Sequence, residues 1–140
     1  MAKTVLYKGF MKALDNSVKE SLVMLKDEIE DAEILPFQTG NLTDSAYVDK
    51  VNDCQYQLVY DPFDSVNNEY YAVDMYYIST LHPEWHLHQS NPPDPVKHNN
   101  KTHKKFNKNA KERWLDDYIQ NPNIVADMLI KCLKNTGYIS

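Results

Sequence analysis

The sequence predicts a small α+β protein: a long N-terminal helix packed on a small antiparallel sheet, then a long irregular excursion, then C-terminal helices. Two periodicities predict this class. Apolar residues recur at every third or fourth position over residues 7–30, which is typical of an amphipathic helix. Residues 54–60 alternate in polarity from one position to the next, which is typical of a half-buried strand. The period changes within residues 36–47, so we expect this segment to form the corner between helix and sheet.

The bulk composition sets limits on the class of protein. A length of 140 residues suits a single domain over residues 1–140. The formal net charge of −5 argues against a general nucleic-acid binder, because such proteins carry a basic face. No apolar run is as long as a bilayer-spanning helix requires. Cys54 and Cys132 cannot form a disulfide framework, and we expect two buried free thiols.

The N-terminal helix is predicted by apolar residues that share one face and by polar residues that we expect to point away from it. Pro36 ends any continuation, since proline disfavours helical geometry in Leu35 before it. The apolar residues are Met11, Leu14, Val18, Leu22, Leu25 and Ile29, and the polar ones are Lys12, Asp15, Lys19, Lys26 and Glu30.

The corner and the following hairpin are predicted from turn residues. Gly40 and Asn41 tolerate positive φ, so the chain can turn sharply there. Residues 46–51 and 54–60 are expected to pair as antiparallel strands around a turn at Asn52 and Asp53. Cys54, Tyr56 and their alternate neighbours then share one face of the sheet.

The tyrosine-rich residues 69–78 fit two periods. Tyrosines and β-branched residues favour a third strand, while Tyr70, Val73 and Tyr77 would form a stripe on a helix. The tyrosines offer apolar area with polar tips, which suits a core edge or an interface equally.

The last part of the chain is predicted as a loop followed by two helices. Residues 79–109 hold four prolines, all five histidines and many asparagines, and we expect an extended loop or arm that a partner orders. Residues 110–120 are predicted to be helical. A second helix is predicted to follow with Asn121 as its cap and Pro122 at its first position, and to stop at Gly137.

Neither catalysis nor a cofactor is predicted. The cysteines have no histidine beside them, the paired carboxylates fall on helix surfaces, and three glycines cannot build a phosphate loop. His82, His86 and His88 could share a zinc ion, but no cysteine lies near them, and we expect loop histidines without a metal. A metal-binding protein, and a small nucleic-acid-interaction module using the lysines of residues 97–108, stay open as alternatives.

Three stretches resemble one protein family. Residues 37–45, Phe-Gln-Thr-Gly-Asn-Leu-Thr-Asp-Ser, resemble the D-T-G-N-L-x-x-S corner of minor capsid proteins of long-tailed bacteriophages, with Gln38 in place of the usual Asp. Residues 71–77 resemble the Y-A-x-x-x-Y-Y segment of these proteins, and residues 107–114 resemble their N-x-x-A-x-x-x-W entry to a terminal helix. Order and rough spacing match across about residues 8–120.

The resemblance implies a head–tail joining (neck, or tail-completion) protein of the virion, assembled in the host cytoplasm. Such proteins form a homo-oligomeric ring, which the resemblance implies to be a hexamer, between the head connector or stopper and the tail terminator or tube. DNA passes through the channel without sequence-specific binding, and no membrane takes part.

The resemblance also assigns structural roles to particular residues. At the corner, Thr39, Gly40, Asn41 and Leu42 are expected to shape the turn and anchor it in the core. Assembly contacts are expected at the aromatic residues Tyr71, Tyr76, Tyr77, Trp85 and Trp114.

The corner yields a first prediction. If Gly40 takes positive φ, Gly40→Val destabilises the fold by about 1–3 kcal/mol, because a β-branched residue is strained in that conformation. Thermal denaturation measures the effect. An unchanged melting temperature would show that the corner does not depend on Gly40.

Overall fold

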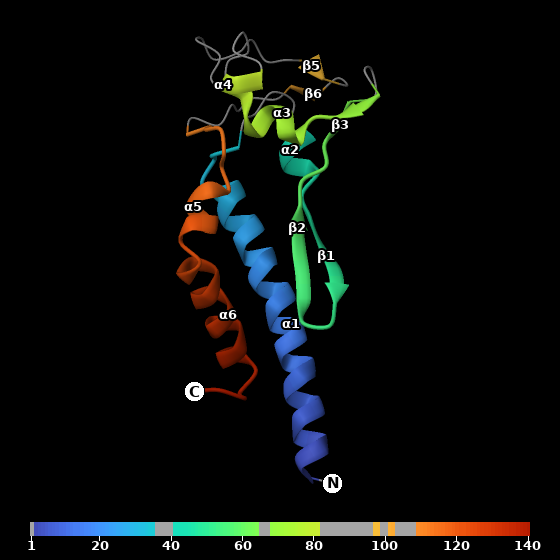
Figure 1. Cartoon of the computed structure of the whole chain (residues 1–140), viewed down its shortest axis with the longest axis vertical. Helices are drawn as coiled ribbons and strands as arrows, with labels where there is room; N and C mark the ends of the chain where they lie inside the picture. The colour runs from blue at the N-terminus through green and yellow to red at the C-terminus, as the bar shows by residue number, and fades with distance from the viewer. Residues whose placement is uncertain (1, 36–40, 65–67, 82–96, 99–100, 103–108) are drawn as a thin grey trace. The chain divides into compact units, whose positions relative to one another are not determined.

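The computed structural model describes residues 2–35, 41–64, 68–81, 97–98, 101–102 and 109–140 (Figure 1). The chain divides into two compact units. The first unit comprises residues 1–27, 47–59 and 117–140, and the second comprises residues 28–46 and 60–116. Each is described by itself below, and the single domain over residues 1–140 stays a prediction.

The first unit contains most of helix α1 (Ala2–Asp31), the hairpin of strands β1 (Tyr47–Asn52) and β2 (Gln55–Val59), and helix α6 (Asn123–Asn135). The hairpin runs along one side of α1 and α6 along another (Figure 1). Contacts at Asp15 join α1 to the hairpin, and Met24 contacts Cys132 of α6. This confirms the predicted class: a long N-terminal helix on a small antiparallel sheet, with C-terminal helices.

Helix α1 ends earlier than Pro36 requires. Its last turn closes when the Ala32 N–H donates to the Glu28 carbonyl, 2.9 Å away, and Glu33 then takes a left-handed conformation with φ 54°. A left-handed residue is a common way to end a helix, because it turns the next N–H back onto the last carbonyls. The stop therefore comes from local backbone geometry before proline acts.

The predicted hairpin is confirmed, with its turn moved by one residue. Tyr47 pairs with Val59 and Val48 with Leu58 in an antiparallel register. The strands leave Asp53 and Cys54 in the turn, and Cys54 has φ 57°. The placement of Cys54 within a strand was therefore wrong. Its thiol is half-buried, whereas that of Cys132 is buried, and both are free.

In the first unit, Tyr138 lies against helix α1 at Gly9 and Phe10. The ring of Tyr138 lies edge-on to that of Phe10, with centroids 5.8 Å apart. A β-carbon added to Gly9 would lie 2.3 Å from the Tyr138 hydroxyl oxygen. Gly9 thus leaves room for the C-terminal tyrosine. Helix α6 ends before Gly137, whose φ of 81° confirms the predicted stop.

The second unit is built from short elements. They are α2 (Asn41–Asp44), β3 (Phe63–Asp64), β4 (Glu69–Tyr70), α3 (Ala72–Tyr76), α4 (Ile78–Leu81), β5 (Lys97–His98) and β6 (Lys101–Thr102). Each strand pair is antiparallel. Among the residues of this unit that the structure describes, the buried ones include Ile29, Leu35, Leu42, Pro62, Ile78, Ala110 and Trp114.

The third strand predicted at residues 69–78 is wrong beyond Glu69 and Tyr70, which form β4, since α3 and α4 occupy most of the rest. The Met75 N–H donates to the Tyr71 carbonyl and the Tyr77 N–H to the Val73 carbonyl, both at 3.1 Å. Helical geometry lets Tyr76 and Ile78 turn inward, which leaves Tyr70, Val73 and Tyr77 exposed. The alternative stripe does not lie on one helix: Tyr70 belongs to β4, Val73 to α3, and Tyr77 lies between α3 and α4.

Residues 110–115 were predicted to be helical, but they are not. Helix α5 (Asp116–Gln120) begins only at Asp116. The Lys111 N–H donates to the Ile34 carbonyl and the Arg113 N–H to the Tyr76 carbonyl, each at 2.9 Å. These bonds hold the backbone out of a helix, and Arg113 has φ 53°. Likewise, Pro122 takes the cap position of α6, while the Asn121 amide donates to the Asp117 carbonyl.

Several predicted features lie outside the described residues. These are Thr39, Gly40, Trp85 and most of the excursion at residues 79–109. Asn41 begins α2, and Leu42 is buried as expected. Among the described helices, none is long and apolar enough to cross a membrane.

Gly9 yields a second prediction. Gly9→Ala should displace Tyr138 from Phe10 and yet leave stability almost unchanged. Alanine gains about 1 kcal/mol over glycine within a helix, which offsets an edge-to-face contact of about 0.5–1.5 kcal/mol. Loss of the Phe10–Tyr138 cross-peaks in NMR, with a constant melting temperature, is the expected result.

The matched control is Gly9→Ala in a Tyr138→Ala background. There the ring is already gone, so only the helix gain of about 1 kcal/mol remains and the melting temperature should rise. Equal effects in both backgrounds would contradict a contact between Gly9 and Tyr138.

Candidate functional site

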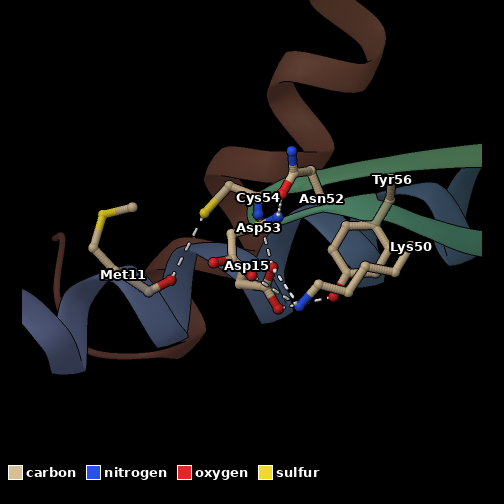
Figure 2. A network of polar contacts seen from close by, with 7 residues as sticks. All are labelled: Met11, Asp15, Lys50, Asn52, Asp53, Cys54 and Tyr56. Carbon is tan, nitrogen blue, oxygen red and sulfur yellow. Dashed lines mark hydrogen bonds and ion pairs between the residues drawn. The ribbon is translucent and has the colours of Figure 1, made fainter.

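A network of polar contacts joins α1 to the turn of the β1–β2 hairpin (Figure 2). Its centre is the carboxylate of Asp15. One oxygen, Oδ1, accepts the Cys54 N–H at 2.8 Å, and the other, Oδ2, accepts the Tyr56 hydroxyl at 2.8 Å. The ammonium of Lys50 lies 3.5 Å from Oδ1 of Asp15 and 3.3 Å from Oδ1 of Asp53. We name these contacts the Asp15 network.

The backbone conformation of the hairpin turn directs these groups toward Asp15. The left-handed conformation of Cys54 directs its N–H toward α1, where a carboxylate is an acceptor of suitable charge. The Asn52 side-chain oxygen accepts the Asp53 N–H at 3.1 Å, which holds the turn, and the Cys54 thiol lies 3.8 Å from the Met11 carbonyl oxygen. The turn is thereby fixed to the helix at two positions one helical turn apart.

The contacts shift the protonation equilibria of all three titratable partners. The bonds from the Cys54 N–H and then the Tyr56 hydroxyl lower the pKa of Asp15. Its bond to Asp15 raises the pKa of Tyr56, and the bond to Asp53 raises the pKa of Lys50. Each shift favours the state in which Asp15 is ionised and its donors keep their protons.

The Asp15 network supports docking better than catalysis. Both carboxylate oxygens of Asp15 are already engaged by backbone and side-chain donors, and the Cys54 thiol points to a carbonyl oxygen instead of a base. Within the described part of the chain, no three His, Cys, Asp or Glu residues gather to hold a metal ion. The three histidines of the metal alternative lie outside that part.

A second cluster lies within the second unit, around Trp114. The ring of Tyr76 contacts it edge-on at 4.7 Å between centroids, and that of Tyr60 at 5.9 Å. The Tyr76 hydroxyl donates to Asp116 at 2.5 Å, and Nε of Arg113 lies 2.7 Å from the same carboxylate. Burial and then the bond to Asp116 raise the pKa of Tyr76 well above its ordinary value.

Bonds at the edge of this cluster fix α4 to the irregular residues 110–115. The Ser79 hydroxyl donates to Glu112 at 2.6 Å, and this bond lowers the pKa of Glu112. The Arg113 guanidinium lies 5.8 Å from the centre of the Tyr77 ring. Residues 71–81 and 109–116 are therefore connected by backbone, aromatic and charged contacts.

The predicted assembly residues differ in their exposure. Tyr77 is 42% exposed, Tyr71 and Tyr76 are half-buried, and Trp114 is buried. Trp114 and Tyr76 pack in the second unit. Tyr77 has the largest exposed fraction of the described members. Assembly contacts at these residues stay a prediction.

Sequence reasoning misplaced one residue of the Asp15 network. Asp15 was expected to point away from the apolar stripe, yet it faces the hairpin. The signal was present: Asp15 lies four residues after Met11 and three before Val18, so it shares their face of the helix. A single acid on an otherwise apolar face indicates a buried or half-buried donor opposite it.

No protein family, curated protein or solved structure matches this chain.

Asp15 yields a third prediction. Its pKa is lowered on folding from 3.8, so it contributes stability that is present above that pH and is lost as the pH falls through the folded-state value. Asp15→Asn should therefore lower the melting temperature near neutral pH and have a smaller effect in strong acid.

Asp49→Asn is the matched control. Asp49 lies on the same hairpin, where it accepts a bond from Gln57 and makes no described contact with α1. Its replacement should leave the melting temperature nearly constant at both pH values. Equal losses for the two variants would contradict a specific role of Asp15.

Proposed function

We propose that this chain is a structural protein of the neck of a long-tailed bacteriophage, where copies form a ring that joins the head connector to the tail around the DNA channel. One observation carries the proposal. Two of the three segments that resemble the family fold against each other: the Arg113 N–H donates to the Tyr76 carbonyl, and the Tyr76 and Trp114 rings are in contact.

The third resembling segment supports the same interpretation. Leu42, expected to anchor the corner, is buried in the second unit together with Leu35 and Ile78. Leu42, Tyr76, Ala110 and Trp114 of the resembling segments thus serve packing. That use fits a protein that acts by its shape and contacts, and the proposal contains no catalytic step.

The surface offers material for contacts with other subunits. Large apolar side chains are exposed in both units, including Tyr7 and Ile119 in the first and Tyr70 and Val73 in the second. Single exposed apolar residues are common, but aromatic ones are enriched where proteins associate. A net charge of −5 also suits a channel through which DNA slides, because it does not hold phosphates.

In this role the chain binds copies of itself, implied to number six, and the neighbouring connector or stopper and tail terminator or tube proteins. It is located at the head–tail junction of the virion after assembly in the host cytoplasm.

The fourth prediction tests this role. Co-expression with the connector and tail proteins of the same phage should give a ring in electron micrographs that co-purifies with at least one of them. Deletion of the gene should leave filled heads and free tails unjoined, and a copy of the gene supplied in trans should restore joining. Normal virions after deletion would rule out the neck function.

A further inference from the structure

A row of lysines follows one face of α1. The four lysines share this face because they follow one another at steps of four and seven residues, which bring a helix back to the same side. At a rise of about 1.5 Å per residue the row is about 27 Å long. The first three are exposed and the last is half-buried. We name these residues the lysine stripe: Lys8, Lys12, Lys19 and Lys26.

Most acidic residues of the exposed half of α1 lie beside the stripe. Glu20 and Asp27 each follow a stripe lysine by one residue, so they lie about 100° further round the helix. An oxygen of Asp27 lies 3.9 Å from the Lys26 ammonium, and Glu30, four residues after Lys26, ends the row. These acids therefore balance charge only at the C-terminal end of the stripe.

The hairpin neutralises the acid in the middle of the stripe. Asp15 is the one acidic residue between Lys12 and Lys19 in the sequence. Its carboxylate oxygens accept the Cys54 N–H and the Tyr56 hydroxyl, and the Lys50 ammonium lies 3.5 Å from one of them (Figure 2). The charge of Asp15 is thus used within the fold and does not offset that of the stripe.

The stripe costs the helix free energy that nothing in the first unit returns. Lys8 and Lys12 stand four residues apart, where like charges destabilise a helix. Among the contacts of the residues that the structure describes, no ion pair involves Lys8, Lys12 or Lys19. A local arrangement that opposes stability is expected where a surface serves binding. The stripe therefore indicates a partner with a row of negative charges.

We propose that the lysine stripe is the surface through which this chain contacts the phosphate backbone of duplex DNA, so that this face of α1 is turned to the channel of the proposed ring. A row of about 27 Å follows about eight base pairs, since duplex DNA carries one phosphate per about 1.7 Å of its axis. Lysines contact phosphates as point charges and read no base sequence. The inference deepens the proposed neck function and rests on it.

The acidity of the remaining chain fits such a contact. The net charge is −5 although the stripe itself is basic. Repulsion between the other surfaces and the phosphates keeps the attraction weak, so DNA is guided past the stripe without being held.

A membrane and an acidic protein fit the stripe less well than DNA. A basic helix binds a membrane by inserting its apolar face, but Val18 is half-buried and Leu25 buried within the first unit. Protein interfaces centre on apolar and aromatic anchors and are depleted in lysine. Among the described residues of α1, the exposed large apolar ones are Tyr7, before the stripe begins, and Val23, which stands alone.

The fifth prediction removes two stripe lysines from the full chain, as Lys12→Gln with Lys19→Gln. Binding to a fluorescein-labelled duplex of mixed sequence is followed by fluorescence anisotropy over a series of salt concentrations. The affinity of the variant at low salt should be about tenfold lower, and the slope of log K against log salt should fall by about 1 per lysine. Glutamine resembles lysine in helix propensity, and circular dichroism checks that the variant folds.

Lys131→Gln with Lys134→Gln is the matched control. Both lysines are exposed on α6, another helix of the first unit, and the change in charge is the same. This variant should bind the duplex with the affinity and salt slope of the wild type. If it loses as much as the stripe variant does, net charge alone is responsible and the proposal fails.

NMR titration of the wild type with the unlabelled duplex locates the contact. The largest amide shifts should fall within residues 8–26, and largest shifts elsewhere in the chain would overturn the assignment to the stripe. Poly-glutamate of equal total charge should bind more weakly than the duplex. Equal affinity would identify an acidic protein as the better partner and would also overturn the proposal.

The outcome is separable from that of the neck function. If the wild type fails to bind the duplex even at low salt, the DNA contact fails, while the ring with connector and tail proteins can still be found. The neck function then stands, and another face of the chain is turned to the channel. Normal virions after deletion of the gene would remove the neck function whether or not the stripe binds DNA.

Discussion

The first unit depends on the bonds that the Asp15 carboxylate accepts from the hairpin. A two-stranded hairpin has too few contacts to be stable in water, so β1 and β2 need a surface to dock on. Their turn also carries Cys54 in a left-handed conformation whose N–H requires an acceptor when it is turned toward the helix. Asp15 supplies that acceptor and binds Tyr56 with its second oxygen, so one side chain satisfies the turn and positions the strand.

The second unit also holds short elements in place, but it does so without a long helix or strand. Its helices and strands are two to five residues long, so little of its order comes from intrinsic propensity. Backbone groups of residues 111 and 113 bond instead to Ile34 and Tyr76, and Trp114 is buried against two tyrosine rings. The segments that resemble phage neck proteins are the ones that make these contacts, which is why the proposed function rests on them.

Whether a feature could be predicted from the sequence depends on how far apart in the sequence the interacting residues lie. The period of helix α1, the pairing of β1 with β2 and the stop at Gly137 depend on residues close in sequence, so periodicity and turn residues predict them, although the docking of the hairpin depends on Asp15. Residues 110–115 carry a helical pattern, but bonds to Ile34 and Tyr76 override it from far along the chain. Residues 69–78 were ambiguous between two periods, and the backbone bonds from Met75 to Tyr71 and from Tyr77 to Val73 show that most of them are helical. Asp15 was misplaced because its donors lie 39 and 41 residues away.

The division into units has a consequence for biosynthesis. The chain passes between the units at residues 27/28, 46/47, 59/60 and 116/117, so neither unit is one continuous stretch of polypeptide. On the ribosome α1 emerges before Cys132 and Tyr138, which contact it at Met24 and Gly9, and Cys132 lies 108 residues further along the chain than Met24. The nascent helix therefore keeps part of its surface uncovered until residues 123–138 have been translated, and a chain that stops before Cys132 would leave it so permanently.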